Sequence, residues 1–96
     1  MSIADKYQRY ICPLAKLKTE ISEFKTLITL SNRDKKIAEY GIRQKKSIYA
    51  NTEKIRGLNK NIEMYSKIIK SLTIKYNNLV ILNRREDEKI KWQKTY

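Results

Sequence analysis

Apolar residues recur in steps of three and four along two stretches of this chain, Ile3–Ile28 and Ile55–Leu79, and neither stretch misses a position. Such steps keep apolar side chains on one stripe of an α-helix, whereas a strand needs steps of two. The spacing therefore predicts an all-α fold with two long heptad-patterned helices. Ile3, Tyr7 and Tyr10 open the first stripe. The predicted helix–helix seam then comprises Leu14, Leu17, Ile21, Phe24, Ile28, Ile55, Leu58, Ile62, Tyr65, Ile69, Leu72, Tyr76 and Leu79.

One helical coiled-coil domain is expected over residues 1–83. It consists of a helix over 2–30, a weaker helical connector over 31–51 and a second helix over 52–83. The stretch 84–96 is charged and lacks the apolar stripe, so we expect a tail or a frayed helix there. The two seams have similar lengths, which suits an antiparallel hairpin or a small bundle. However, the second seam has isoleucine at three a positions and leucine at three d positions, which favours two parallel helices and hence a homodimer. Both arrangements stay open.

Helix starts and breaks are marked by a few residues. Ser2 and Ser31 each stand three residues before an aspartate, which is a relative of the capping box, and Thr52 offers a third start. Pro13 interrupts the first stretch and predicts either a kink or a new helix with Pro13 at its first position. Gly41 weakens the connector, because glycine in a helix costs about 1 kcal/mol relative to alanine.

Several classes of functional site are excluded by composition. The chain has no histidine, two glycines and one cysteine, Cys12. A Cys/His zinc site, an imidazole-activated nucleophile and a glycine-rich phosphate loop therefore cannot be built within one chain. The carboxylates of the Glu86-Asp87-Glu88 run point in different directions on a helix and make a poor metal site. We expect no catalytic site, no cofactor and no metal, and so no enzyme.

Localisation and source are suggested only by composition. The longest apolar run, Leu79–Leu82, is far too short to span a membrane. An intracellular protein of the cytoplasm, nucleoid or nucleus is expected. Lysine, isoleucine and asparagine make up 37 of the 96 residues, a usage typical of AT-rich genomes such as those of phages, viruses, plasmids or low-GC organisms.

Positive charge is spread over the chain, with 22 lysines and arginines against 10 carboxylates and a net charge of +12. Sixteen of the cations are lysine, which suits diffuse phosphate neutralisation rather than base readout. The partner is therefore expected to be DNA or RNA, bound with weak sequence preference, or an acidic protein surface. A merely solvated face is the alternative. The candidate contact residues are Arg33, Lys35, Lys36, Arg43, Lys45, Lys46, Arg56, Lys60, Lys67 and Lys70.

Some aromatic and apolar residues lie off the seams. Seam tyrosines are interpreted as core, whereas Tyr40, Tyr49, Trp92 and Tyr96 are better candidates for contacts. Ile74 and Ile81 stand seven residues apart at position f, opposite the second seam. They predict a second interface, unless a wider bundle lets the connector cover them.

Two functional hypotheses follow from these patterns. The first is a non-catalytic protein that associates with nucleic acid or a nucleoprotein complex. The alternative is a protein–protein adaptor, scaffold or inhibitor of the phage, virus or mobile-element type that docks on an acidic partner protein. Either would form a homo-oligomer, with a dimer favoured, away from membranes.

Overall fold

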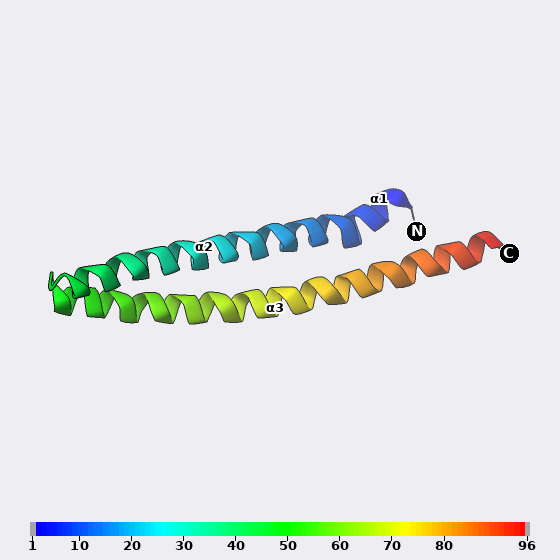
Figure 1. Ribbon diagram of the computed structural model, residues 1–96. Helices are drawn as coiled ribbons and strands as arrows, with labels where there is room; N and C mark the ends of the chain where they lie inside the picture. Colours follow the sequence, from blue (N-terminus) through cyan, green and yellow to red (C-terminus); the bar gives the residue numbers. More distant parts are fainter. Residues whose placement is uncertain (1, 96) are drawn as a thin grey trace. The chain divides into compact units, whose positions relative to one another are not determined.

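The computed structural model describes the backbone of residues 2–95 and the side chains of residues 2–89. The described backbone is helical almost throughout and contains no strand. Its elements are α1 (Ile3–Lys6), the π-helical turn η1 (Tyr7–Ile11), α2 (Cys12–Arg43) and α3 (Ile48–Thr95), drawn in Figure 1. The predicted all-α fold is confirmed.

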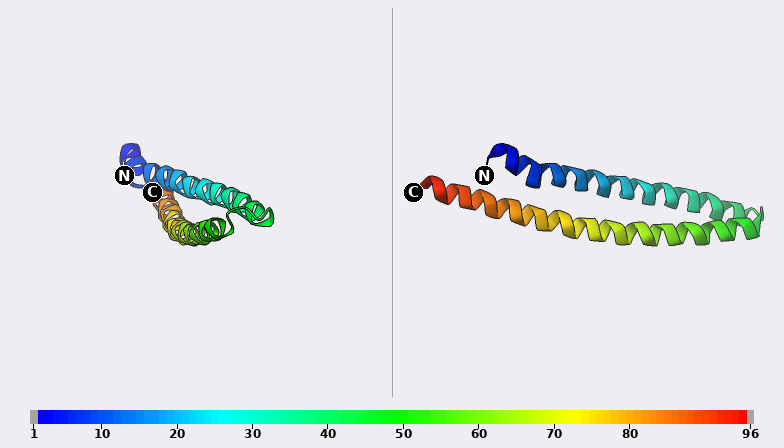
Figure 2. Two further views of the ribbon diagram at one scale, coloured as in Figure 1. Left: turned by 90° about the vertical axis from the view of Figure 1, so that its left-hand side faces the viewer. Right: turned by 180° about the vertical axis from the view of Figure 1, so that it is seen from behind.

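Contacts divide the chain into two compact units. Unit 1 combines Met1–Ile21 with Ser71–Tyr96, and unit 2 is Ser22–Lys70. In Figures 1 and 2, the two stretches of unit 1 lie side by side and run in opposite directions, and the two stretches of unit 2 do the same. Each unit, taken by itself, is thus an antiparallel pair of helical stretches.

The apolar stripes account for the pairing within each unit. None of the thirteen predicted seam residues is exposed: Leu72 is buried and the other twelve are half-buried. In unit 2, the rings of Phe24 and Tyr65 face each other with centroids 5.9 Å apart. In unit 1, Lys6 forms an ion pair with Asp87 across the two stretches. Burial of these apolar stripes is the main favourable contribution to the free energy of folding, because the two helices have little other contact.

The first stripe begins later than the spacing predicts. Ile3 and Tyr7 are 90% and 54% exposed, and Tyr10, 6% exposed, is the first buried residue. Ser2 does start the chain's first helix, since its Oγ accepts a hydrogen bond from the amide of Asp5 at 3.1 Å.

A π-helical turn accommodates Pro13. The amide of Cys12 donates to the carbonyl of Tyr7, five residues back, where an α-helix would use the carbonyl four back. Proline has no amide to donate, and in a regular α-helix its ring collides with the carbonyl of residue i−4, so the wider turn falls where Pro13 disfavours the α-helical pattern. One prediction was a short first helix followed by a new helix with Pro13 at its first position. The structure has the short first helix, but α2 begins at Cys12, so Pro13 is its second residue.

The predicted helix boundaries need correction. No helix begins at Ser31, because α2 continues unbroken to Arg43. The residues that carry the seam onward are small or polar: Ser31 is 8% and Ala38 2% exposed, at the next d positions after Phe24. A stripe predicted from large apolar residues alone overlooks these positions, although their small side chains still fit against a partner helix. The turn at residues 44–47 lies inside the stretch predicted as a connector, and α3 begins at Ile48.

Helix α3 also extends beyond its predicted end, because the stretch that was expected to be a tail or frayed helix is helical as far as Thr95. Half-buried Asn83 and Glu86 continue the heptad spacing after Leu79 with polar side chains. Trp92 and Tyr96, predicted as contact candidates, lie outside the residues whose side chains are described.

Candidate nucleic-acid interface

The turn between α2 and α3 is built by a pair of nested hydrogen bonds. The amide of Lys46 donates to the carbonyl of Gly41, and the amide of Lys45 donates to that of Ile42, both at 2.9 Å. This is the Schellman pattern, which satisfies the last carbonyls of a helix and requires a left-handed residue just after it. Lys45 is that residue, with φ of 57°. Glycine usually occupies this position, because a side chain there is strained.

The other side of the turn is held by Asn51. Its Nδ2 donates to the carbonyl of Lys46 at 2.8 Å, which ties the first turn of α3 back to the loop. Gly41 makes room for this contact, because a Cβ at that position would lie 2.5 Å from Asn51 Nδ2. Ser47 is also left-handed, with φ of 44°, and its carbonyl accepts the amide of Asn51 at 2.9 Å. Asn51 is not among the residues predicted from the sequence, since a lone asparagine gives no periodic signal.

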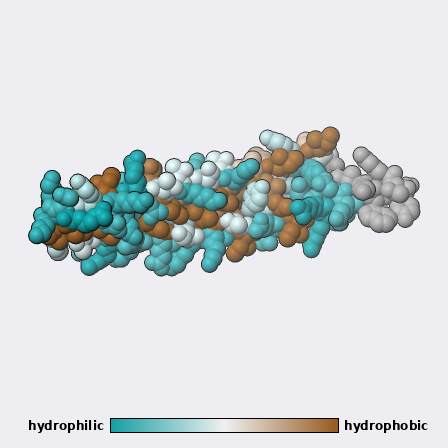
Figure 3. All heavy atoms as spheres, viewed as in Figure 1, coloured by the Kyte–Doolittle hydropathy of each residue, from teal (hydrophilic) through white to brown (hydrophobic). Residues whose placement is uncertain are grey.

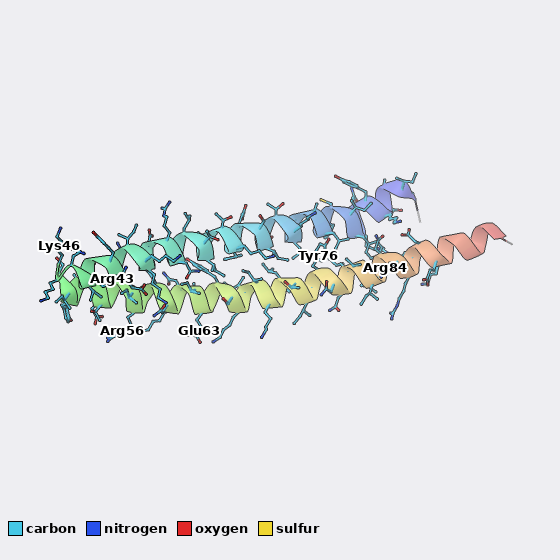
Figure 4. All side chains as sticks on the ribbon, in the orientation of Figure 1. Arg43, Lys46, Arg56, Glu63, Tyr76 and Arg84 are labelled. Carbon is cyan, nitrogen blue, oxygen red and sulfur yellow. The ribbon has the colours of Figure 1, made fainter. Side chains whose placement is uncertain are left out.

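Three exposed cations stand on this turn, and we refer to Arg43, Lys45 and Lys46 as the turn cluster. Figure 4 shows Arg43 and Lys46 where α2 gives way to α3. Within the described part of the chain, no carboxylate comes within 4.0 Å of these three side chains. Unneutralised cations on a constrained turn are a favourable place for an anion of a partner to bind.

The remaining candidate cations differ in their surroundings. Arg56 pairs with Glu53 at 3.1 Å and Lys67 with Glu63 at 3.3 Å, and these exposed pairs contribute little to stability. In Figure 4, Arg56 and Glu63 extend from α3 on the side away from α2. Arg33 lies 3.9 Å from Asp34.

The other four candidates have no described carboxylate within 4.0 Å. Lys36, Lys60 and Lys70 are exposed, whereas Lys35 is half-buried at the a position between Ser31 and Ala38. Lys35 therefore lies on the pairing side of α2, unlike the other nine candidate cations.

All ten candidate cations belong to unit 2. This unit carries twelve lysines and arginines against five carboxylates, a net charge of +7, whereas unit 1 has ten against five, a net charge of +5. Unit 2 is one continuous stretch of the sequence, so the grouping of these cations follows directly from their positions along the chain.

Apart from Tyr7, which is 54% exposed on the first stripe, the described tyrosine side chains separate into two groups. Tyr10 is buried, and Tyr65 and Tyr76 are half-buried on the seams. Tyr40 and Tyr49 instead stand on either side of the turn in unit 2, 59% and 80% exposed.

Unit 1 carries an apolar surface of its own on α3. Ile74 and Ile81 are 58% and 47% exposed. Ile81 also lines a shallow surface groove of about 390 Å³, together with Asn78, Leu82 and Arg85. In Figure 3, hydrophobic spheres remain visible among hydrophilic ones on the face shown, so helix pairing leaves apolar side chains at the surface.

Two further kinds of site concern the described residues, namely a metal centre and a membrane-spanning helix. No group of three or more histidine, cysteine or carboxylate side chains among them could hold a metal ion. No described helix combines the length and apolar character that crossing a membrane requires.

Comparison with known proteins adds no relative. No protein-family model, no curated protein and no solved structure matches this chain.

Proposed function

We propose that this chain is a non-catalytic, small basic helical hairpin of the coiled-coil type that associates with nucleic acid or a nucleoprotein complex through the lysine-rich surface of unit 2. Nine of the ten candidate cations are exposed in that unit, and most have no carboxylate beside them. Lysine ammonium groups on stiff helices neutralise phosphates without reading base edges, so the expected binding has little sequence preference.

The turn cluster carries the proposal. A left-handed lysine after a helix costs about 1 kcal/mol or more relative to glycine, so Lys45 keeps a cation at a position where its backbone is strained. Strained residues are concentrated at functional sites, where the strain is retained for a reason other than stability. Arg43 and Lys46 place two further cations on the same turn.

The test compares the turn cluster with three exposed lysines of unit 1. The triple variant Arg43→Gln/Lys45→Gln/Lys46→Gln is matched by Lys16→Gln/Lys18→Gln/Lys75→Gln, which removes the same charge. Affinity for a labelled oligonucleotide is measured by fluorescence anisotropy at several salt concentrations. Each phosphate contact contributes about 0.9 for a DNA duplex, or about 0.7 for a single strand, to the slope of log affinity against log salt, so losing the turn cluster should flatten that slope by about 2 to 3.

The control variant should flatten the slope by less than the contribution of one phosphate contact. Equal losses of affinity in the two triple variants would show that binding depends on net charge alone and not on the turn cluster. Affinity that does not change with salt in the unmodified chain would remove the proposal altogether.

A second candidate function is favoured by the exposed Ile74 and Ile81. Under it, the chain is an adaptor, scaffold or inhibitor that docks on an acidic partner protein, with this isoleucine pair supplying apolar contact. Ile74→Glu/Ile81→Glu should abolish capture of that partner from the native source while circular dichroism shows unchanged helix content. Capture that survives the substitution would remove this candidate's support.

A further inference from the structure

Two tyrosine rings flank the turn of unit 2 with most of their surface in water. Tyr40 precedes the end of α2 by three residues and Tyr49 is the second residue of α3. At a rise of about 1.5 Å per residue, each Cα lies within about 5 Å of the turn along its own helix. The rings are 59% and 80% exposed, so unit 2 covers little of either.

Apart from Tyr7, the tyrosines on the apolar stripes are less exposed than these two rings. Tyr10 is buried, and Tyr65 and Tyr76 are half-buried, as expected for a side chain that gains much by leaving water. Ile37 and Ile48, also near the turn, are 60% and 51% exposed. The turn end of unit 2 thus carries an uncovered apolar and aromatic surface beside the unpaired cations of the turn cluster.

Flat aromatic faces beside free cations match the chemistry of an unpaired nucleotide. Its base offers a π-face to a tyrosine ring, and its phosphate offers a negative charge to a lysine or arginine. In a duplex the base faces are already stacked on each other and cannot reach a ring. Cations alone would bind either form, so the rings are what would distinguish a single strand.

We propose that the turn end of unit 2 binds single-stranded nucleic acid, with bases stacked on Tyr40 and Tyr49 and phosphates held by the turn cluster. This inference rests on the proposed function and specifies the form of nucleic acid. Every base has a π-face and stacking does not involve the sugar, so single strands of DNA and of RNA are both bound with little sequence preference.

The experiment uses the full chain and three labelled probes of about 12 nucleotides, a length within the range that stacking sites occupy. The probes are oligo-dT, oligo-rU and a mixed-sequence DNA duplex. Anisotropy is measured at one fixed salt concentration for the unmodified chain, for Tyr40→Leu/Tyr49→Leu, and for Tyr40→Phe/Tyr49→Phe, which keeps both rings. Tyr7→Leu serves as a control, because Tyr7 is a 54% exposed tyrosine of unit 1.

The unmodified chain should bind both single strands at least about tenfold more tightly than the duplex. Replacing both tyrosines with leucine should weaken single-strand binding by about tenfold for each ring and leave duplex binding within about twofold. The phenylalanine variant and Tyr7→Leu should stay within about twofold of the unmodified chain on every probe. Circular dichroism of each variant excludes loss of helix as the cause.

Equal affinity for single strand and duplex, or a leucine variant that binds the single strands normally, would overturn this inference and leave the proposed function standing. Failure of all three probes to bind the unmodified chain would instead overturn the proposed function. A leucine variant that loses duplex binding equally would show that the rings support the turn rather than the bases, and would also overturn the inference.

Discussion

Lys45 occupies the position after α2 at which a helix most often places glycine. Its left-handed backbone is stabilised by the nested hydrogen bonds to Ile42 and Gly41, so the local structure tolerates the strain without removing it. A residue of this kind separates two properties that usually change together, namely the stability of the turn and the charge that the turn presents.

Replacing Lys45 with glycine or with alanine should separate these two properties experimentally. Both changes remove the same charge, but only glycine relieves the left-handed backbone. Lys45→Gly should raise the free energy of unfolding by about 1 kcal/mol, whereas Lys45→Ala should leave it nearly unchanged. Urea denaturation followed by circular dichroism measures this difference, and both variants should lose the same amount of nucleic-acid affinity. A destabilised glycine variant would contradict the assigned backbone conformation.

The two glycines of the chain should respond in opposite ways to alanine. Gly57 is exposed in α3, and a Cβ there would meet nothing within 4 Å beyond its chain neighbours and the adjacent backbone of its own helix, so Gly57→Ala should stabilise by about 1 kcal/mol through helix propensity. Gly41→Ala gains the same propensity, but its Cβ displaces Asn51 Nδ2 and disrupts that atom's bond to Lys46.

At position 41, the gain in helix propensity opposes the loss of the Asn51 hydrogen bond. Thermal denaturation measures the balance when the two alanine variants are compared with Asn51→Ala and Gly41→Ala/Asn51→Ala. The double variant should recover the propensity gain relative to Asn51→Ala alone. Equal stabilisation by both single alanines would show that Asn51 moves aside without loss.

At the level of individual residues, properties that follow from residue type could be predicted from the sequence. Contacts that depend on three-dimensional proximity could not. The sequence identified the turn cluster as candidate contacts because charge can be read from the letters. It included Lys35, whose half-buried place on the pairing side follows from a heptad position occupied by a polar residue. The contact of Asn51 with Gly41 could not be predicted, because it depends on where the chain turns.

At the scale of elements, heptad spacing predicted the two helices but not their ends. The apolar stripe is the same in any helix that pairs along one face, and small residues such as Ser31 and Ala38 extend the pairing without adding an apolar letter. The end of α2 is decided by the hydrogen bonds around Lys45, a position where sequence rules expect glycine. Element type was therefore easier to predict than element length.

Leu72 is the best single test of the seam in unit 1, since it is 9% exposed while Ile74, two residues on, is 58% exposed. Leu72→Lys removes a buried side chain and forces a charge toward the pairing stretch, which should destabilise the fold by about 2–5 kcal/mol. At chain concentrations low enough to keep the chain monomeric, Ile74→Lys introduces the same charge on the same helix and should change stability by no more than about 0.5 kcal/mol. Chemical denaturation compares the two, and similar losses would place the seam on the wrong face of α3.

At the scale of the whole molecule, the seam residues of α3 already pair within each unit, so a homodimer would have to use other surfaces. Ile74 and Ile81 are the exposed apolar pair predicted from the sequence, and they offer such a surface. Sedimentation velocity over a range of concentrations should show dimers of the unmodified chain and monomers of Ile74→Glu/Ile81→Glu. High salt should strengthen the dimer, because it screens the repulsion between two chains of net charge +12. An unmodified chain that remains monomeric at every concentration would exclude this self-association.

The sequence predicted an all-helical molecule but left the direction of pairing open. Matched seam lengths suited an antiparallel pair, and isoleucine and leucine placement suited a parallel one, because both arrangements bury the same apolar stripe. What separates them is a short turn, and its formation depends on backbone hydrogen bonds that carry no distinctive sequence signature here.

The turn at residues 44–47 also implies an order of folding. Gly41 and Asn51, which meet beside it, are ten positions apart in the sequence, whereas Lys6 and Asp87 of unit 1 are 81 apart. The entropy lost on closing a chain segment grows with its length, so contacts in unit 2 form sooner and those in unit 1 later. Amide hydrogen exchange should therefore be slowest in the α2 and α3 stretches of unit 2 and fastest at Ile3–Ile11 and after Asn83. Uniform protection along both helices would indicate that the chain opens all at once rather than unzipping from its termini.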